Sequence, residues 1–333
     1  MVALLLALPA AAGATSYGAG VGDAFANQTQ GVWSAQQTVA SLQALYAAGG
    51  RLGRTQVRWA DIEPAAPTRG RHVYGWATAD LIAGEMAQAH VRWQPILADP
   101  PLWAQQRGPN QVPDVHGVLV TVPLPPAHNA QFAAFAAAFA RRYGAGGSFW
   151  RSNPSLPYVP VRAFEVWNEP DEALSWGPRV NLRRYEVMYE VVRTAIRRVD
   201  RHAEVVSGGV AWTPTSLPRL LKAFRGKPLD AIAFHPYAAT PEGTVALARY
   251  AIKQLAKHGR DRTPLLANEF GWTSLPGIWG STDPANLDSY VYQAILGLSK
   301  LHLAEVLPFE WAMPWWGLSD GTLARALTAI RAG

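Results

Sequence analysis

Short runs of β-branched and aromatic residues alternate with longer amphipathic segments along most of this chain. Eight runs have the composition of β-strands; they are residues 15–21, 54–59, 91–97, 161–167, 203–209, 229–235, 263–269 and 304–311. Segments with the three- and four-residue apolar spacing of helices lie between or after them; they are residues 33–50, 77–90, 129–144, 181–200, 215–226, 244–259, 285–302 and 322–333. Strand–helix alternation repeated eight times predicts an α/β fold, a single-domain (β/α)8 TIM barrel.

A doubly wound open sheet is the alternative architecture. It would need a phosphate-binding turn after an early strand, and "GAGVGD" at residues 18–23 comes close to one. Asp23 stands where the last glycine of G-x-G-x-x-G belongs, so the barrel is favoured. The chain has 333 residues, which suits one such barrel, and no linker or low-complexity segment divides it. We therefore expect one catalytic domain over residues 15–333.

Residues 1–14 are apolar and rich in small side chains. They resemble the core of a signal peptide with a cleavage site near Ala12–Ala14, although the basic leader is missing. This predicts a signal-peptide remnant and a secreted protein, extracellular or periplasmic; a hydrophobic first strand is the alternative. The run is too short for a good membrane span, so no stable membrane insertion is expected.

Composition narrows the function classes. The formal charge is +6, but the arginines are spread over predicted helix faces and form no long basic block, which argues against a nucleic-acid partner. The 14 tryptophans are more informative, because several stand beside turn-forming Pro and Gly near strand ends. Indole rings in such places suit a cleft that binds sugars, since a sugar offers an apolar face and polar edges.

Two acids stand at predicted strand ends. "WNEP" at 167–170 carries Glu169 after the fourth strand, and "ANEFGW" at 267–272 carries Glu269 after the seventh. In a barrel both would project onto the same face, where the loops after strands form the catalytic site. Two carboxylates that face one bond are what glycoside hydrolysis needs. The long, Pro-rich connection at 98–129 follows the third strand and is expected to build a cleft wall.

These motifs resemble the retaining β-glycosidases of glycoside hydrolase clan A, in particular bacterial cellulase-like and β-xylosidase-like members. "RTQVRWADIEPAAPTRGRHVYGW" from Arg54 and "LDAIAFHPY" from Leu229 are similar to the second- and sixth-strand segments of the same proteins. The resemblance therefore covers nearly the whole chain after the leader.

The resemblance implies a role for each matching residue. Glu169 would be the acid/base and Glu269 the nucleophile, with their carboxyl groups about 5 Å apart, as retention requires. Arg54 would hold Glu269 ionised, Asn168 would bond the sugar 2-hydroxyl, and His235 or Tyr237 would donate to Glu269 or to a hydroxyl. The expected aromatic contacts to the sugar are Trp103, Trp272 and Trp311, with Trp311 as the floor of the subsite.

The residues leave some assignments open. Arg58 lies on the same strand face as Arg54, and Glu310 could replace Glu269 as the nucleophile. Glu165 is expected to be a buried partner of an arginine. No metal or cofactor motif is present, so no cofactor is expected, and the expected partner is an oligo- or polysaccharide. The alternative functions are a carbohydrate-binding barrel without catalysis and a transglycosylase on the same site.

Overall fold

The computed structural model describes residues 14–332 apart from residues 115–116, 278–279, 312 and 317. Of the predicted leader, only Ala14 belongs to this part of the chain, so that prediction lies outside the described residues. No helix in the described ranges combines the length and the apolar character that crossing a bilayer requires.

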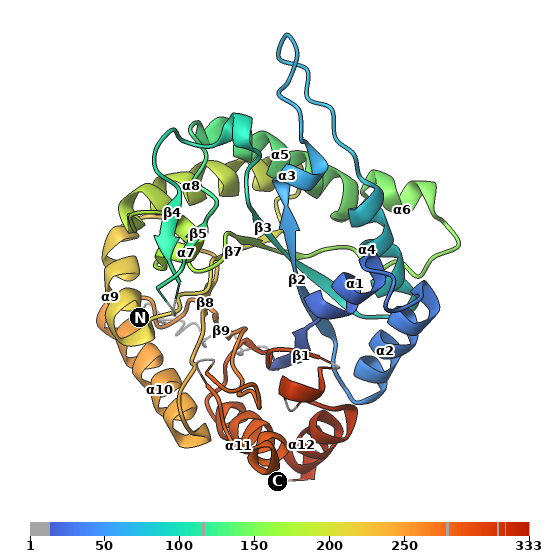
Figure 1. The fold of residues 1–333 in the computed structure, drawn as a ribbon, viewed down its shortest axis with the longest axis vertical. Helices are drawn as coiled ribbons and strands as arrows, with labels where there is room; N and C mark the ends of the chain where they lie inside the picture. The colour runs from blue at the N-terminus through green and yellow to red at the C-terminus, as the bar shows by residue number, and fades with distance from the viewer. Residues whose placement is uncertain (1–13, 115–116, 278–279, 312, 317, 333) are drawn as a thin grey trace, which may run out of the picture.

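Eight parallel strands form one sheet that curves into a barrel (Figure 1). Around the sheet the order is β7-β6-β3-β2-β1-β10-β9-β8. The strands are β1 Ser16–Gly20, β2 Leu52–Arg58, β3 Arg92–Ala98, β6 Ala163–Val166, β7 Glu204–Ser207, β8 Ile232–Phe234, β9 Leu265–Ala267 and β10 Glu305–Val306. Isolated parallel bridges, Val206 to Ala231 and Val210 to Phe234, join the two ends of the sheet. All eight predicted strands are found, and the prediction of a (β/α)8 barrel is confirmed.

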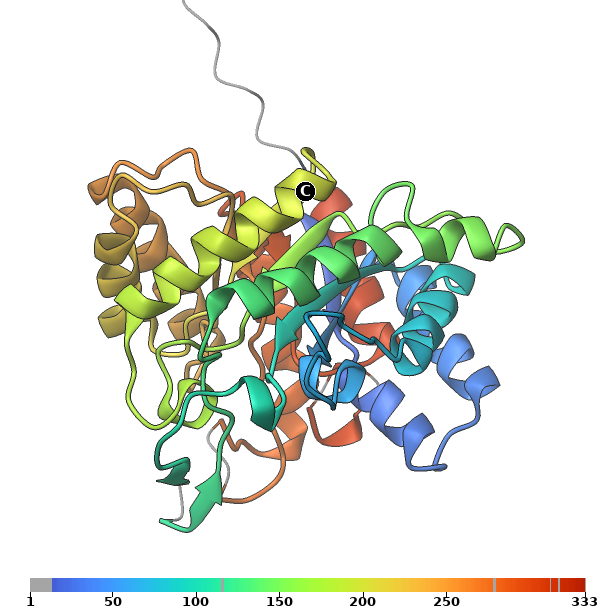
Figure 2. The ribbon, with the colours of Figure 1, turned by 90° about the horizontal axis from the view of Figure 1, so that it is seen from above.

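Helices surround the barrel (Figures 1 and 2). The long ones are α2 Ala35–Ala47, α4 Ala77–Gln88, α5 Asn129–Tyr143, α8 Leu182–Val199, α9 Thr213–Ala223, α10 Pro241–Lys257, α11 Leu287–Ser299 and α12 Asp320–Ala332. Each coincides with a segment of helical periodicity. The sequence pattern missed the smaller elements, which are α1 Gly22–Thr29, α3 Trp59–Ile62, α6 Ser148–Ser152, α7 Ala173–Trp176 and the hairpin strands β4 Gln111–Pro113 and β5 Leu119–Thr121.

The packing of α5 fixes the strand end that carries Glu169. Phenylalanines recur every three or four residues on this helix and are fully buried. The Phe139 ring meets the Phe164 ring of β6 edge-on at 6.4 Å, and the Phe132 ring meets Trp167 edge-on at 6.0 Å. Such edge-to-face contacts add about 0.5–1.5 kcal/mol each beyond burial, so the end of β6 is held firmly from behind.

The opposite end of the barrel interior holds an unusual acid. Glu305 of β10 is 9% exposed, and its Oε2 atom has no hydrogen-bond partner among the described residues. Burial, with the negative charge of Glu204 adding to it, raises the pKa of Glu305 to about 8. Between the ordinary pKa of 4.5 and the folded value of about 8, the native state therefore keeps this carboxyl protonated, whereas the unfolded chain would release the proton.

We expect this acid to make stability depend on pH. Its folded pKa of about 8 lies above the ordinary 4.5, so the free energy of unfolding should fall as pH rises from about 4.5 to 8. Glu305→Gln should remove that slope and stabilise the protein at pH 8 by about 1–3 kcal/mol. Urea denaturation at several pH values tests this; an unchanged slope in the variant would contradict it.

Candidate active site

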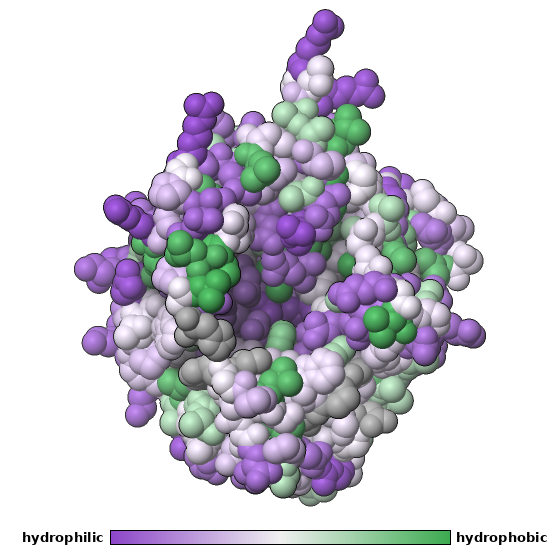
Figure 3. Space-filling view, in the orientation of Figure 1, coloured by the Kyte–Doolittle hydropathy of each residue, from purple (hydrophilic) through white to green (hydrophobic). Residues whose placement is uncertain are grey.

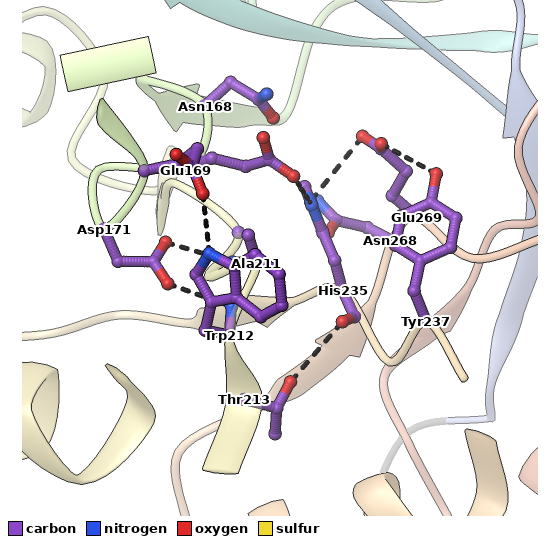
Figure 4. A network of polar contacts seen from close by, with 12 residues as sticks. Asn168, Glu169, Asp171, Ala211, Trp212, Thr213, His235, Tyr237, Asn268 and Glu269 are labelled. Atoms are coloured by element: carbon purple, nitrogen blue, oxygen red, sulfur yellow. Dashed lines mark hydrogen bonds and ion pairs between the residues drawn. The ribbon is translucent and has the colours of Figure 1, made fainter. Parts of the chain in front are cut away.

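The barrel brings two carboxylates and one imidazole together. Glu169 follows β6, His235 follows β8 and Glu269 follows β9, so all three stand at the carboxyl ends of strands. One oxygen of each acid and a ring nitrogen of His235 all lie within 4.8 Å of one another (Figure 4). Residues separated by 100 positions in the chain thus share one site, as the barrel topology predicted.

Glu269 is surrounded by donors. Arg54 Nη1 donates to its Oε2 at 2.7 Å and the Tyr237 hydroxyl donates to its Oε1 at 2.9 Å. His235 Nε2 lies 3.7 Å from Oε2. Burial alone would raise the pKa of Glu269, but the charges of His235 and Arg54 outweigh it and hold the pKa below the ordinary value. The carboxyl is therefore ionised at neutral pH.

Arg54 ties this acid to the barrel interior. The guanidinium is 4% exposed, and its Nε and Nη2 donate to the two oxygens of Glu165 at 2.8 and 2.9 Å. Nη2 also donates to Asn168 Oδ1 at 2.9 Å. Glu165 is itself fully buried, which confirms it as the partner of an arginine. The site arginine is thus Arg54, since Arg58 is 57% exposed and pairs with acids at the surface.

The pKa of Glu169 is raised, in contrast to that of Glu269. Burial raises its pKa; the His235 Nδ1 contact at 2.8 Å opposes that rise, and the negative charges of Glu269 and Asp171 add to it. The backbone around it is strained, because Trp167 and Glu169 adopt φ values of 72° and 45°, a region that bulky residues rarely occupy. Strain of this kind persists where the surroundings enforce it, and it is common at functional sites.

His235 links the two acids from a fully buried position. Burial alone would lower its pKa, but the nearby carboxylates of Glu269 and Glu169 raise it. The ring fits only because residue 209 is glycine: a Cβ atom there would stand 2.1 Å from His235 Nε2. The sequence does not reveal this requirement, because Gly208 and Gly209 indicate only the end of a strand.

A clamp joins the loop of Glu169 to the loop after β7. The Asp171 carboxylate accepts from the backbone N–H groups of Ala211 and Trp212, each at 3.0 Å. The Trp212 indole N–H donates to Glu172 Oε2 at 2.6 Å, and 52% of this side chain is exposed. Figure 4 shows the indole beside the loop of Glu169. Trp212 is therefore an exposed aromatic face at the site, and the sequence analysis missed it.

Two of the three expected sugar-binding tryptophans are corrected by the structure. Trp272 is 1% exposed and donates to the Ala238 carbonyl, while Trp311 is 2% exposed and donates to the Ser41 carbonyl of α2. Both indoles are packing residues, so Trp311 is not a subsite floor. Trp103 is partly buried, donates to the Glu63 carbonyl and meets Trp59 edge-on at 5.3 Å.

Glu310, the rival nucleophile, stands in a different environment. It is 2% exposed and accepts a hydrogen bond from the backbone of Asp23. Burial, together with the charge of Asp23, raises its pKa well above the ordinary value. A buried carboxyl that keeps its proton is a poor nucleophile, so the geometry favours Glu269.

A small cavity of about 160 Å³ adjoins Asn168. Its walls come from the ends of β2 and β3, from Pro123 and from Leu174 and Ser175 of α7. The space-filling view shows a hydrophilic depression at the centre of this face (Figure 3). The connection 98–129 contributes Asp99 and Pro123 to the cavity, as expected of a cleft wall.

The same three side chains, Glu169, His235 and Glu269, could in principle hold a cation. However, both oxygens of Glu269 already accept hydrogen bonds from Arg54 and Tyr237. The fixed positive charge of Arg54 also opposes a second cation at that carboxylate. The donor set suits a carboxylate held by hydrogen bonds better than a metal ligand.

Comparison with known proteins gives the fold but no family. The sequence matches no protein-family model and none of the curated proteins. A β-xylosidase from Caulobacter crescentus has a TM-score of 0.69 at 16% identity, over 98% of this chain and 69% of that one. A glucosidase from Croceicoccus marinus has a TM-score of 0.65 at 15% identity, over 88% and 63% of the two chains.

A third match is an endoglucanase from Thermotoga maritima, with a TM-score of 0.59 at 12% identity over 87% of this chain and 89% of that one. These three matches, all at 16% identity or less, show the barrel fold of this chain. All three proteins are glycoside hydrolases, which agrees with the resemblance carried by the sequence motifs, and no comparison assigns this chain to a family. The chain spans about two thirds of the length of the glucosidase and the β-xylosidase.

We expect Gly209→Ala to disturb the site. A methyl group at this position would overlap His235 Nε2, so the imidazole must move away from both acids. Overpacking of this kind costs about 1–3 kcal/mol of stability. Gly84→Ala is the matched control, because that helix position has no atom closer than 3.8 Å and the change should be neutral or stabilising. Thermal unfolding measures both; equal melting temperatures for the two variants would contradict the prediction.

Proposed function

We propose that this protein is a retaining glycoside hydrolase that cleaves β-linked bonds in an oligo- or polysaccharide. The observation that carries the proposal is the pair Glu169 and Glu269, whose nearest oxygens lie within 4.8 Å and whose pKa values are shifted in opposite directions. A separation of about 5 Å suits retention rather than inversion. Opposite shifts supply one protonated acid and one ionised carboxylate at the same pH.

In the first step Glu269 attacks the anomeric carbon and forms a glycosyl ester. Glu169 gives its proton to the departing oxygen as that bond breaks. Ester formation removes the negative charge of Glu269, which had contributed to the raised pKa of Glu169. The pKa of Glu169 therefore falls, and the ionised group can take a proton from the water that hydrolyses the ester in the second step.

The neighbouring residues support the same chemistry. Arg54 and Tyr237 hold the Glu269 oxygens in place, so that one carboxylate orientation is fixed before substrate arrives. Asn168 stands between Arg54 and the small cavity, in reach of a sugar hydroxyl. Trp212 offers an exposed indole on the Glu169 side, where the leaving group would lie.

Two other functions share this geometry. A barrel that only binds carbohydrate would have no use for two neighbouring carboxyl groups whose pKa values are shifted in opposite directions, so catalysis is favoured. A transglycosylase differs only in the acceptor that attacks the glycosyl ester. Secretion of the protein stays a prediction from residues 1–14.

The decisive experiment compares three glutamine variants. Glu269→Gln should abolish hydrolysis of aryl β-glycosides, because no ester can form. Glu169→Gln should lower kcat by about a hundredfold to ten-thousandfold on substrates with poor leaving groups, and far less for the first step with an activated aryl group that needs no proton.

Glu310→Gln is the matched control, since that buried acid lies outside the proposed chemistry and should leave kcat near the wild-type value. Circular dichroism verifies that each variant is folded. Wild-type turnover by Glu269→Gln, or complete loss of turnover in Glu310→Gln alone, would overturn the assignment. Product analysis by NMR reports whether the anomeric configuration is retained.

The pH profile should reflect the two acids. Activity needs Glu269 ionised, and its pKa lies below the ordinary 4.5, so kcat/KM should fall only in strongly acidic solution. Activity also needs Glu169 protonated, and its pKa is raised, so the alkaline limb should begin above 4.5. In Glu169→Gln, measured with an activated aryl glycoside, the alkaline limb should disappear while the acidic limb remains. An alkaline limb unchanged in that variant would assign it to another group.

A further inference from the structure

A second and larger cavity, of about 590 Å³, lies beside the proposed site. Two segments form it: the connection after β3, around Gln106–Pro109 and Leu124, and the segment from the end of α7 to the first turn of α8. Its volume is within the range of sites that bind small molecules. Figure 1 shows α7, β4 and β5 together on one side of the barrel opening.

The charged residues that line this cavity are all arginines: Arg107, Arg179 and Arg184. None of the three forms a salt bridge within the described residues. Arg184 is half-buried and donates to the Pro126 carbonyl at 2.6 Å, and burial lowers its pKa. Arg107 and Arg179 are exposed to water, and Arg184 also has the Gln106 side-chain amide oxygen as a neutral acceptor. Three positive charges at one cavity, with no acid among its lining residues, make it attractive to an anion.

The cavity continues the wall of the cleft. Pro123, Leu174 and Ser175 line the small cavity next to Asn168, while Leu124 and Trp176, their neighbours in the chain, line the arginine cavity. Consecutive Cα atoms are only 3.8 Å apart. An extended oligosaccharide bound at the small cavity could therefore extend to the arginines.

We propose that the arginine cavity is a subsite for a sugar unit that carries a carboxylate, within the substrate of the proposed hydrolase. A guanidinium binds a carboxylate through two parallel hydrogen bonds, which gives direction as well as attraction. The inference rests on the proposed function, because that function makes an oligosaccharide the substrate. Binding of the acidic sugar itself can be measured without turnover.

The test is an equilibrium titration with D-glucuronate, D-glucose and sodium sulfate at low salt. A monosaccharide has no glycosidic bond to cleave, so the result does not depend on hydrolysis. D-glucuronate should bind at least about tenfold more tightly than D-glucose, because the neutral sugar lacks the charge-assisted hydrogen bonds. The double variant Arg107→Gln and Arg179→Gln should lose that preference.

Arg249→Gln is the matched control, because this exposed arginine lies on the outer helix α10 and its loss changes the net charge without touching the cavity. It should keep the preference, and thermal unfolding verifies that all variants are folded. Equal binding of D-glucuronate and D-glucose, or a preference that survives in the double variant, would overturn the subsite. Sulfate that binds as tightly as D-glucuronate and displaces it would also overturn it, because the cavity would then recognise an anion and not a sugar.

The two proposals fail separately. Binding of D-glucuronate by a protein whose Glu269→Gln variant hydrolyses as well as wild type would leave the subsite standing and remove the proposed catalysis. Loss of hydrolysis in Glu269→Gln together with no preference for D-glucuronate would do the reverse. If an acidic polysaccharide proves to be a substrate, its KM should be about tenfold higher for the double arginine variant than for the wild type.

Discussion

The buried guanidinium of Arg54 is the interaction on which the site depends. An isolated charge inside a barrel would be expensive, and this one is stabilised by the fully buried carboxylate of Glu165. The remaining donors bind Glu269 and Asn168, so one side chain of β2 fixes groups that follow β6 and β9. Because arginine keeps its charge at any relevant pH, it favours the ionised form of Glu269 permanently.

The pKa of Glu169 is shifted in the opposite direction, because Arg54 does not contact it. The guanidinium acts on Glu269, whereas burial raises the pKa of Glu169; its contact with the buried His235 opposes that rise and the negative charge of Glu269 adds to it. Holding these groups together requires costly local structure, namely positive φ values at Trp167 and Glu169 and a glycine against the His235 ring. The barrel tolerates that cost because α5 and the Asp171 clamp hold the loop from both sides.

The sequence predicts the parts of this arrangement that depend on periodicity. Strand ends place Glu169 and Glu269 on one face, since the carboxyl ends of all barrel strands meet there. Periodicity could not separate Arg54 from Arg58, because positions four apart on a strand share a face. Arg58 is the last residue of β2, where it is exposed and pairs with Asp61 and Asp99. The prediction that Trp272 and Trp311 contact the sugar is wrong because the carbonyls that accept from their indoles, those of Ala238 and Ser41, belong to residues remote in the chain.

The sequence also did not indicate that Trp212 is exposed at the site. An indole beside a turn is as consistent with packing as with binding, and the group that accepts from the Trp212 indole, Glu172, is 40 residues away. The same limit applies to the arginine cavity. Arg184 belongs to a helix that the sequence shows only as amphipathic, and Arg107 belongs to a connection without periodicity. Contacts between loops of different strands decide both features, and a single sequence does not reveal those contacts.

Charge then sets a condition on any substrate. The ionised Glu269 at the centre of the face would repel a carboxylate bound directly against it, whereas the arginine cavity attracts one. A polymer with anionic units would therefore bind with a neutral sugar at the acids and an acidic sugar at the arginines. The spacing between the two sites would fix which bond meets Glu169. Recognition of charge at a distance would thus select the point of cleavage, with no change in the catalytic residues themselves.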